Sequence, residues 1–492
     1  MIDIKIDRDG GIPLYVQIRD EIINAVENGD LKGGDRLPAV TSFAKTLGVT
    51  ACTVRRAFED LTKDGLAHCH VGRGTFINET DKVQPEKTVK IPKSVDRSKS
   101  YSFNSLIKLI EKDGLIRFTS GGLSHNLTKK GVFDKVVTET LKANDQSKFQ
   151  IGVPQGKIEL RETISDRFKS RGHNIDPDQI LITGGTQQAV FLMAHRAFLR
   201  DHKVLFETPW FSGMANAFKA FNHLIHTVPR DLKGPVPENY TGFPIEPTTF
   251  YVCPIYNNPM GTNMHPDRSK ALIDWTRKNG GKILSDEVYY ELYFDKPADS
   301  FLSEVNGGNV AVSGSMSKSF MFGMRLGWIV GSKDLIDELL PLKRTIDMGV
   351  PTLIQNVANT LIKSGEYDSN LEILRGHYKN VRDATLDALT RFMPDEVKWT
   401  KPEGGFHIWV ELPENYSSVD TFLTAIDNGV AMVPGPLLDP DNGYDNAFKL
   451  SYGSIDLKDV DKGIKALANA VKKTLLSKPC AAGICSDNTD FR

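Results

Sequence analysis

The segment that decides the fold is VAVSGSMSKSFMFGMRLGWIVG, residues 310–331. It contains an apolar run, small residues around Lys318, then Arg325 and a second apolar run. Burial and neighbouring cations can lower the pKa of a lysine enough for it to form an imine. Ser315, Ser317 and Arg325 offer hydroxyls and a guanidinium to a phosphate dianion. A lone lysine in a serine-rich loop is normally solvated, so the neighbouring segments must decide between these two interpretations.

Two earlier segments offer groups for a phosphate and a ring. ILITGGTQQAV, residues 180–190, predicts a strand, a Gly-Gly-Thr turn and a helix whose first amides, with the Thr186 hydroxyl, suit a phosphate. CPIYNNPMGTNMHP, residues 253–266, places Asn258 in an Asn-Pro-x-Gly turn after a strand. A plain strand-to-helix turn is the commoner explanation of the first segment alone.

A third segment, GGKILSDEVYYEL at residues 280–292, ends a buried apolar run in Asp286 and reaches Tyr289. A carboxylate at the carboxyl end of a parallel strand lies where α/β folds bind ligands. An aspartate there can pair with a protonated ring nitrogen and make the ring an electron sink. Taken alone, a helix-capping Asp beside a core Tyr explains the segment equally well.

The order of these segments resembles the fold-type I, class I/II aminotransferases over residues 100–475. The resemblance implies pyridoxal phosphate, with Lys318 forming the internal aldimine, Asp286 pairing with the pyridine nitrogen, and Asn258 and Tyr289 holding the phenolic oxygen. Lys318, Asp286 and Tyr289 would be the catalytic residues. The phosphate would be surrounded by Gly185, Thr186, Gln187, Ser315, Ser317 and Arg325, and the ring would stack on Phe211 of ETPWFSG.

The resemblance also predicts the strand KPEGGFHIWVEL, which matches the Gly-Gly-x-x-x-Trp strand near the site. Two positions depart from the family pattern. Ile151 in IGVPQG replaces a Tyr that reaches the neighbouring subunit's phosphate, and Lys449 in FKLSYG replaces the Arg that clamps the substrate carboxylate. Lysine keeps the charge but loses the forked geometry, so a differently anchored substrate or effector is expected at Lys449.

The first 78 residues predict three helices and a hairpin around Gly72 and Gly74, the winged helix-turn-helix pattern. The third helix begins after Thr50, a suitable N-cap, and has small and polar residues at its start, as a helix entering the DNA major groove requires. Residues 1–80 contain 10 Lys and Arg against 12 Asp and Glu, a net charge of −2, so DNA binding must depend on local arrangement. The predicted DNA contacts are Arg36, Thr50, Thr53, Arg55, Arg56 and Arg73.

Residues 13–77 resemble the GntR-type winged-helix domain through PLYxQI, GDLKxGDRLP, LGVTxxTVRRAFxxL, DGL and GRGTFI. In that family an Arg after the LP pair usually contacts the DNA backbone, and Thr41 stands in its place here. Without this resemblance, a solvated helix face would explain Arg55 and Arg56 as well as DNA contact does. With it, double-stranded DNA is the expected partner.

Composition sets the outer limits of the prediction. The chain has 492 residues, 40% hydrophobic and 25% charged, with 61 Lys and Arg against 62 Asp and Glu, which excludes a wholly disordered or fibrous protein. Five scattered cysteines argue against a disulfide framework, and neither an apolar leader nor a membrane-length apolar run is present, so we expect a cytoplasmic protein. Cys480 and Cys485 lack further metal ligands, which favours an unstructured tail.

The predicted domains are a GntR-type winged helix at 1–78, an extended charged linker at 79–100, an aminotransferase-like PLP-binding domain at 101–476 with a smaller C-terminal α+β subdomain, and a loose tail at 477–492. Such a head joined to such a body resembles the MocR family of transcriptional regulators. This resemblance implies a homodimeric, PLP-dependent regulator that senses an amino acid, an amine or PLP by aldimine exchange at Lys318.

The alternatives are an active aminotransferase with a secondary winged helix, and a binding protein that uses neither activity. Asn258 favours retained chemistry, whereas Ile151 and Lys449 argue against an ordinary substrate. Conversion of the cofactor to its pyridoxamine form by an amino donor would distinguish the enzyme from the sensor.

Overall fold

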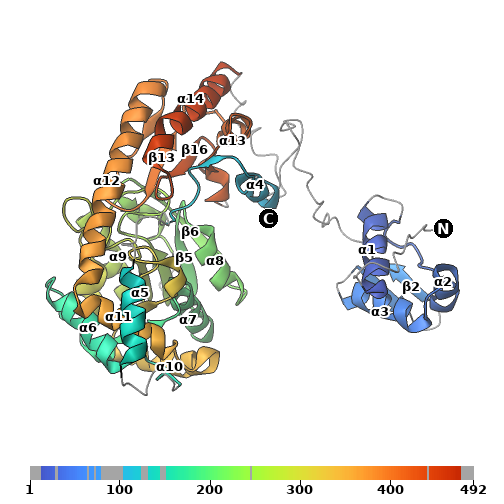
Figure 1. Ribbon diagram of the computed structural model, residues 1–492, viewed down its shortest axis with the longest axis horizontal. Coiled ribbons are helices and arrows are strands. Elements are labelled where there is room, and N and C mark those ends of the chain that lie inside the picture. Colours follow the sequence, from blue (N-terminus) through green and yellow to red (C-terminus); the bar gives the residue numbers. More distant parts are fainter. Residues whose placement is uncertain are drawn as a thin grey trace. The chain divides into compact units, whose positions relative to one another are not determined.

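The computed structural model describes residues 13–27, 31–63, 66–70, 74–78, 103–122, 131–143, 151–243, 246–439 and 443–477. The chain divides into two compact units, Met1–Ile91 and Pro92–Arg492, and each is described here by itself (Figure 1). Arg73, the predicted linker 79–100, and residues 478–492 of the predicted tail with Cys480 and Cys485 lie outside the described residues. The bounds of the four predicted segments therefore stay predictions.

The N-terminal unit has the predicted winged helix-turn-helix architecture, and its elements are α1 Leu14–Glu27, α2 Val40–Leu47, α3 Ala51–Lys63, β1 Ala67–His70 and β2 Gly74–Ile77. The apolar positions of α1 bury Ile18 and Ile22 completely in one cluster with Val54 of α3. The hairpin is antiparallel, with Ala67 opposite Ile77 and His70 opposite Gly74. This confirms the predicted fold class of the head.

The larger unit is organised around an eight-stranded sheet in the order β4–β11–β10–β9–β8–β5–β6–β7. The strands, in chain order, are β4 Ile180–Thr183, β5 Lys203–Thr208, β6 Ile225–Asp231, β7 Gly234–Pro235, β8 Thr248–Val252, β9 Lys282–Asp286, β10 Val310–Ser315 and β11 Gly327–Val330. Strands β10, β9, β8, β5 and β6 pair in parallel, whereas β11 is antiparallel to β10 and β4.

Both faces of this sheet are buried, which is why its strands are continuous apolar runs in the sequence. Neighbouring residues such as Ile283 and Leu284 belong to different core clusters, one on each face. One face packs against α7 Thr186–Leu199, α8 Ser212–Lys219 and α10 Lys333–Asp347. The other packs against α5 Val132–Lys142, α6 Ile158–Lys169, α9 Pro266–Lys278 and α11 Thr352–Lys363.

A smaller subdomain is built on a sheet in the order β12–β13–β16–β15, with bounds β12 Lys398–Trp399, β13 His407–Glu411, β15 Val433–Pro434 and β16 Ala447–Ser451. A short parallel pair joins β3 Ile116–Arg117 to β14 Val430–Ala431. The helices here are α4 Phe103–Ile110, α13 Ser418–Asp427 and α14 Val460–Leu476. The long helix α12, Glu366–Phe392, contributes side chains to the cores of both subdomains and runs past both in Figure 1.

This arrangement confirms the predicted α/β body with a smaller C-terminal α+β part. Within the described ranges, no helix is long and apolar enough to cross a membrane.

Candidate functional site

Four predicted segments meet because each follows the carboxyl end of a strand of the large sheet. Asp286 ends β9, while Lys318, Thr186 and Phe211 each follow a strand, β10, β4 or β5, by three residues. A cavity of about 190 Å³ lies there. The predicted residues that line it are Thr186, Phe211, Asn258, Asp286, Tyr289, Lys318 and Lys449. Sequence reasoning had placed these residues at one site, and the structure brings them together.

Lys318 is not a solvated loop lysine. Its Nζ donates to the carbonyl oxygen of Gly121 at 3.1 Å and lies 4.3 Å from the centre of the Phe322 ring. Burial lowers the pKa of Lys318 to about 8; the Asp286 carboxylate opposes this effect, and the Arg325 charge adds to it. About a tenth of the amine is therefore uncharged at pH 7 and able to act as a nucleophile.

Asp286 is buried and held by three hydrogen bonds. Its Oδ2 accepts the Tyr251 hydroxyl at 2.8 Å, and its Oδ1 accepts the Val288 N–H at 3.3 Å and the Ser313 hydroxyl at 3.4 Å. Burial raises the pKa of Asp286, and these bonds oppose the rise. Sequence reasoning missed Tyr251; its signal was a tyrosine inside the buried strand TTFYV, where a hydroxyl needs a partner.

The cavity also contains a set of hydrogen-bonded polar side chains, of which the sequence had indicated only some. Lys449 is buried and donates to Asn258 Oδ1 at 3.2 Å, while Tyr289 Oη lies 3.0 Å from His407 Nε2. Burial, together with the Lys318 charge, lowers the pKa of Lys449 to about 7. His407 was missed, although it lies inside the motif KPEGGFHIWVEL; the one signal was a polar residue in an apolar strand.

The predicted phosphate residues gather beside this cavity. Ser315 Oγ donates to the Leu326 carbonyl at 2.8 Å and accepts the Ser317 N–H at 3.0 Å. Arg325 is exposed, has a φ of 47°, and donates to the Gly184 carbonyl at 3.2 Å. Gln187 is exposed and donates to the Gly213 carbonyl at 3.2 Å. Thr186 lines the cavity itself.

Gly185 explains how this loop approaches Arg325 so closely. It has a φ of +94°, and a Cβ added there would lie 3.1 Å from Arg325 Nη2. The glycine thus leaves room for a guanidinium beside a helix start, a cradle that fits an anionic group. Ile151, the departure noted above, is 77% exposed.

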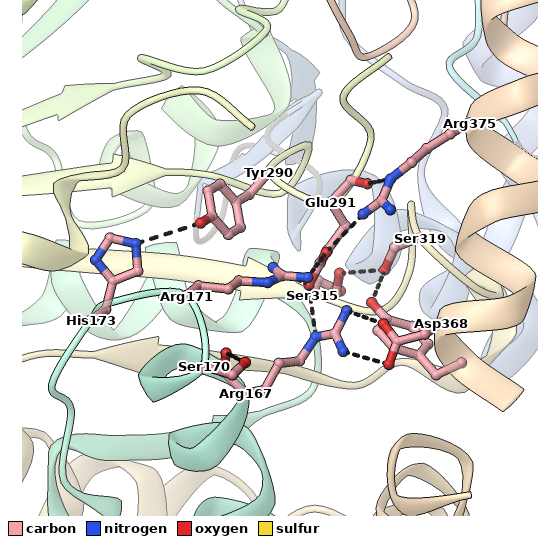
Figure 2. A network of polar contacts seen from close by, with 11 residues as sticks. Arg167, Ser170, Arg171, His173, Tyr290, Glu291, Ser315, Ser319, Asp368 and Arg375 are labelled. Atoms are coloured by element: carbon pink, nitrogen blue, oxygen red, sulfur yellow. Dashed lines mark hydrogen bonds and ion pairs between the residues drawn. The ribbon is translucent and has the colours of Figure 1, made fainter. Parts of the chain in front are cut away.

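A second polar network anchors the chain just beyond Tyr289 (Figure 2). Three arginines hold Glu291: Arg167 Nε at 3.0 Å, Arg171 Nη2 at 2.7 Å, and Arg375 through the Glu291 carbonyl at 2.8 Å. Burial alone would raise the pKa of Glu291, but Arg167 and Arg171 lower it below its ordinary value. The site loop is therefore tied to α6 and α12, a connection that no sequence spacing had indicated.

In the N-terminal unit, the predicted contact residues are on exposed elements. Thr50 Oγ1 accepts the Thr53 N–H at 3.2 Å, the cap predicted for α3. Arg55 and Arg56 are both exposed, but the Arg56 guanidinium lies 4.2 Å from the centre of the Tyr15 ring. Arg56 therefore also packs against α1.

Arg36 lies against the hairpin, 6.0 Å from the Phe76 ring centre. A Cβ at Gly74, whose φ is +111°, would approach Arg36 Nε to 2.9 Å, so the glycine leaves space for this arginine. Arg73 lies outside the described residues.

Comparisons with known proteins agree with both halves of this description. Residues 113–467 match the model of aminotransferase class I and II, which is more than half of the chain. The chain belongs to the aminotransferase class I and II family. Residues 14–77 match the model of bacterial regulatory proteins of the gntR family. A gntR-type head on a class I/II aminotransferase body is the MocR-like architecture.

Some relatives of the chain are transcriptional regulators and others are aminotransferases. An uncharacterized HTH-type transcriptional regulator of Bacillus subtilis, YisV, is 28% identical over 96% of this chain and 98% of its own length. A 2-aminoadipate transaminase of Thermus thermophilus is 28% identical over 78% of this chain and 96% of its own. The crystal structure of a Pyrococcus horikoshii kynurenine aminotransferase superposes with a TM-score of 0.71 at 30% identity, covering 78% of this chain and 98% of that one.

Class I and II aminotransferases use pyridoxal phosphate, and the donor set of this cavity fits that group. It offers the partly uncharged amine of Lys318, the buried carboxylate of Asp286 and the partly exposed ring of Phe211. The space between Gly185 and Arg325 beside it suits a phosphate. The residues present therefore fit the cofactor, apart from Ile151, which stands where the family has a phosphate-contacting Tyr.

Proposed function

We propose that this protein is a PLP-dependent, DNA-binding transcriptional regulator whose larger unit senses an amino acid, an amine or PLP at Lys318. One observation carries the proposal: a gntR-type head and a cavity lined by Lys318, Asp286, Asn258 and Tyr289 occur in one chain of the class I/II aminotransferase family. The similarity to YisV, which extends over 96% of the chain, supports the same interpretation. The proposal includes a homodimer, as the resemblance to the MocR family implies. It also includes a cytoplasmic location, because the protein must reach DNA.

The cavity residues have distinct tasks in this proposal. When bound, pyridoxal phosphate supplies a carbonyl carbon and an electron-withdrawing ring. The Lys318 amine would hold the carbonyl carbon, Asp286 would hold a proton at the ring nitrogen, and Asn258 with Tyr289 would hold the ring oxygen. Phe211 would cover the ring, and the phosphate would be held by Gly185, Thr186, Gln187, Ser315, Ser317 and Arg325.

Lys449 would be the anchor for a ligand anion. Its ammonium is buried beside Asn258, and burial keeps its pKa near 7, so a ligand carboxylate would favour the charged form. In the head, Arg55, Arg56 and Arg36 would contact DNA together with Thr50, Thr53 and Arg73. Sensing requires that the ligand bind one DNA-binding state of the protein more tightly than another.

An active aminotransferase is the second candidate, and one observation favours it. Lys318, Asp286, Asn258 and Tyr289 all line one cavity, which brings a lysine, a carboxylate and two ring-oxygen partners together for proton transfer at the cofactor. Similarity to the 2-aminoadipate transaminase supports this candidate over 78% of the chain.

The test uses the full-length protein loaded with pyridoxal phosphate. Bound sequences are selected from a random duplex pool, and their affinity is then measured by fluorescence anisotropy during titration with a panel of amino acids and amines. The cofactor absorbance is recorded in the same samples. A ligand that changes both the absorbance and the DNA affinity supports the regulator.

Two results would contradict this proposal. Absence of any selected sequence would remove the DNA-binding function. Complete loss of the absorbance band with an amino donor, its recovery with a keto acid, and unchanged DNA affinity throughout would identify the aminotransferase instead.

A further inference from the structure

His407 is a buried histidine whose two ring nitrogens are both engaged. It belongs to β13, is 1% exposed and lines the cavity. Its Nε2 lies 3.0 Å from Tyr289 Oη, and its Nδ1 lies 2.9 Å from Ser451 Oγ. The Tyr289 and His407 rings meet edge to face with centroids 5.4 Å apart. The ring therefore connects a cavity hydroxyl with a hydroxyl behind the cavity.

The imidazole is kept neutral. Burial lowers the pKa of His407 well below its ordinary value, and the positive charges of Lys449 on β16 and Lys318 after β10 lower it further. A neutral imidazole has one N–H donor and one acceptor nitrogen. One of the two bonds is therefore donated by the ring and the other is accepted.

Ser451 determines which nitrogen carries the proton. Its side chain is fully buried, and among the described residues His407 Nδ1 is the partner of its Oγ. A buried hydroxyl that cannot donate costs about 1–3 kcal/mol. Ser451 therefore donates to Nδ1, so Nε2 carries the ring proton and donates to Tyr289 Oη.

Asn258 is the second side chain that hydrogen-bonds Tyr289. Its Oδ1 already accepts Lys449 Nζ, which leaves its amide N–H for the neighbouring hydroxyl. Burial raises the pKa of Tyr289 well above its ordinary value, and the bond from Asn258 lowers it, as a bond donated to the phenol oxygen does. Both lone pairs of Tyr289 Oη then accept hydrogen bonds, so its O–H bond points into the cavity.

We propose that His407 is a positioning residue that turns the Tyr289 hydroxyl proton into the cavity, and that Ser451 sets its tautomer. The inference rests on the proposed binding of pyridoxal phosphate here and is independent of DNA binding. A bond donated by Tyr289 to the ring oxygen of the cofactor would stabilise the oxygen's negative charge. It would thereby lower the pH at which the bound cofactor changes its absorbance.

The test measures this pH midpoint in the PLP-loaded full-length protein. Ser451→Ala removes the donor that keeps the ring proton on Nε2, so the ring is no longer held in one tautomer; where Nδ1 carries the proton, Nε2 accepts the Tyr289 proton and withdraws it from the cavity. His407→Phe keeps the aromatic contacts and removes the donor. Both variants should raise the midpoint by about one pH unit, the scale of one charge-assisted hydrogen bond.

Three variants serve as controls. Ser451→Thr keeps the hydroxyl and His407→Gln keeps both an acceptor and a donor, so both should retain the wild-type midpoint. Ser319→Ala removes an equally buried hydroxyl that bonds Tyr367 at 2.7 Å, and should leave the midpoint unchanged. The charged groups around the cofactor, Asp286, Lys318, Lys449 and Arg325, are the same in every variant.

Thermal unfolding and cofactor affinity are measured alongside. If His407→Phe does not fold, Ser451→Ala and Ser451→Thr decide, because Ser451 lies behind the cavity. An unchanged or lowered midpoint in folded Ser451→Ala overturns the inference while the cofactor site stands. No cofactor absorbance in the wild-type protein would overturn both.

Discussion

In the N-terminal unit, Arg55 and Arg56 are exposed on α3 and Arg36 is exposed ahead of α2, whereas Lys449 in the larger unit is buried and Lys318 faces a cavity. The use of the exposed arginines depends on where they point. The pKa of Lys318 is lowered to about 8 and that of Lys449 to about 7, because burial penalises the charged form of each lysine. In the proposed function, the same sign of charge would thus serve DNA binding in one unit and reactivity in the other.

The comparison also separates two kinds of dependence on neighbours. An exposed arginine loses little when one neighbour is changed, because water replaces the lost contact. A buried ionisable group depends on each hydrogen bond and charge around it. Substitutions in the larger unit should therefore have larger and less additive effects than substitutions in the head.

The largest effect is expected for Lys318→Ala. It should abolish covalent attachment of pyridoxal phosphate, because no other amine would hold the carbonyl carbon, while the fold is kept. Absorbance spectra and the protein mass after borohydride reduction measure this. Lys333→Ala, an exposed lysine at the start of α10, is the control and should bind as the wild type does. A reduced cofactor adduct surviving in Lys318→Ala would show that another lysine, with Lys449 the first suspect, takes this role.

The second effect concerns the network of Figure 2. Glu291→Ala leaves Arg167, Arg171 and Arg375 without their shared carboxylate and should destabilise the larger unit by about 3–5 kcal/mol. Denaturant unfolding followed by tryptophan fluorescence measures it, since all five tryptophans lie beyond residue 200.

The matched control for this network is Asp368→Ala. It removes a carboxylate that pairs with Arg167 at 2.7 Å but is half exposed, and should cost under about 1 kcal/mol. Equal losses in the two variants would mean that burial does not separate the two carboxylates.

These expectations mark what sequence alone could and could not predict. Asp286, Lys318 and Thr186 were predictable because each follows an apolar run, and such runs are parallel strands whose carboxyl ends meet. The three helices and hairpin of the head were predictable from apolar spacing and glycine positions. The partners Tyr251, His407 and Glu291 were not, because each meets its neighbours through the tertiary fold and leaves no local spacing pattern.

Lys449 lies between these cases. Its identity as a lysine in place of an arginine was visible in FKLSYG, but its burial and its bond to Asn258 required the packed sheet of the smaller subdomain. Arg56 is the reverse case: the helix face was predicted, and its contact with the Tyr15 ring was not.

A third effect tests a buried carboxylate by pH. Glu287 accepts the Phe301 N–H and the Ser285 hydroxyl, both at 2.9 Å, yet burial raises its pKa from 4.5 to about 7. A raised folded-state pKa stabilises the fold below pH 4.5, and this contribution is lost as pH rises through 7. Glu287→Gln has no such loss.

The free energy of unfolding of the wild type, relative to Glu287→Gln, should therefore fall by about 3 kcal/mol between pH 4.5 and pH 8. Tryptophan-detected urea unfolding at several pH values measures the difference, in which the pH dependence of all other groups cancels. Parallel curves for the two proteins would show that Glu287 keeps an ordinary pKa.

The smallest effect returns to the exposed arginines. Arg55→Ala should weaken binding to selected DNA by about 1–3 kcal/mol and reduce discrimination between sequences, if its fork contacts a base edge. Arg56→Ala should weaken binding to all sequences more evenly, and should also lower the stability of the head by about 0.5–1 kcal/mol because its contact with Tyr15 is lost. Anisotropy titrations with selected and scrambled duplexes separate the two arginines. If both variants lose affinity equally on both duplexes, the two arginines act only through the phosphates, and sequence must be read by the other residues of α3 or by the hairpin.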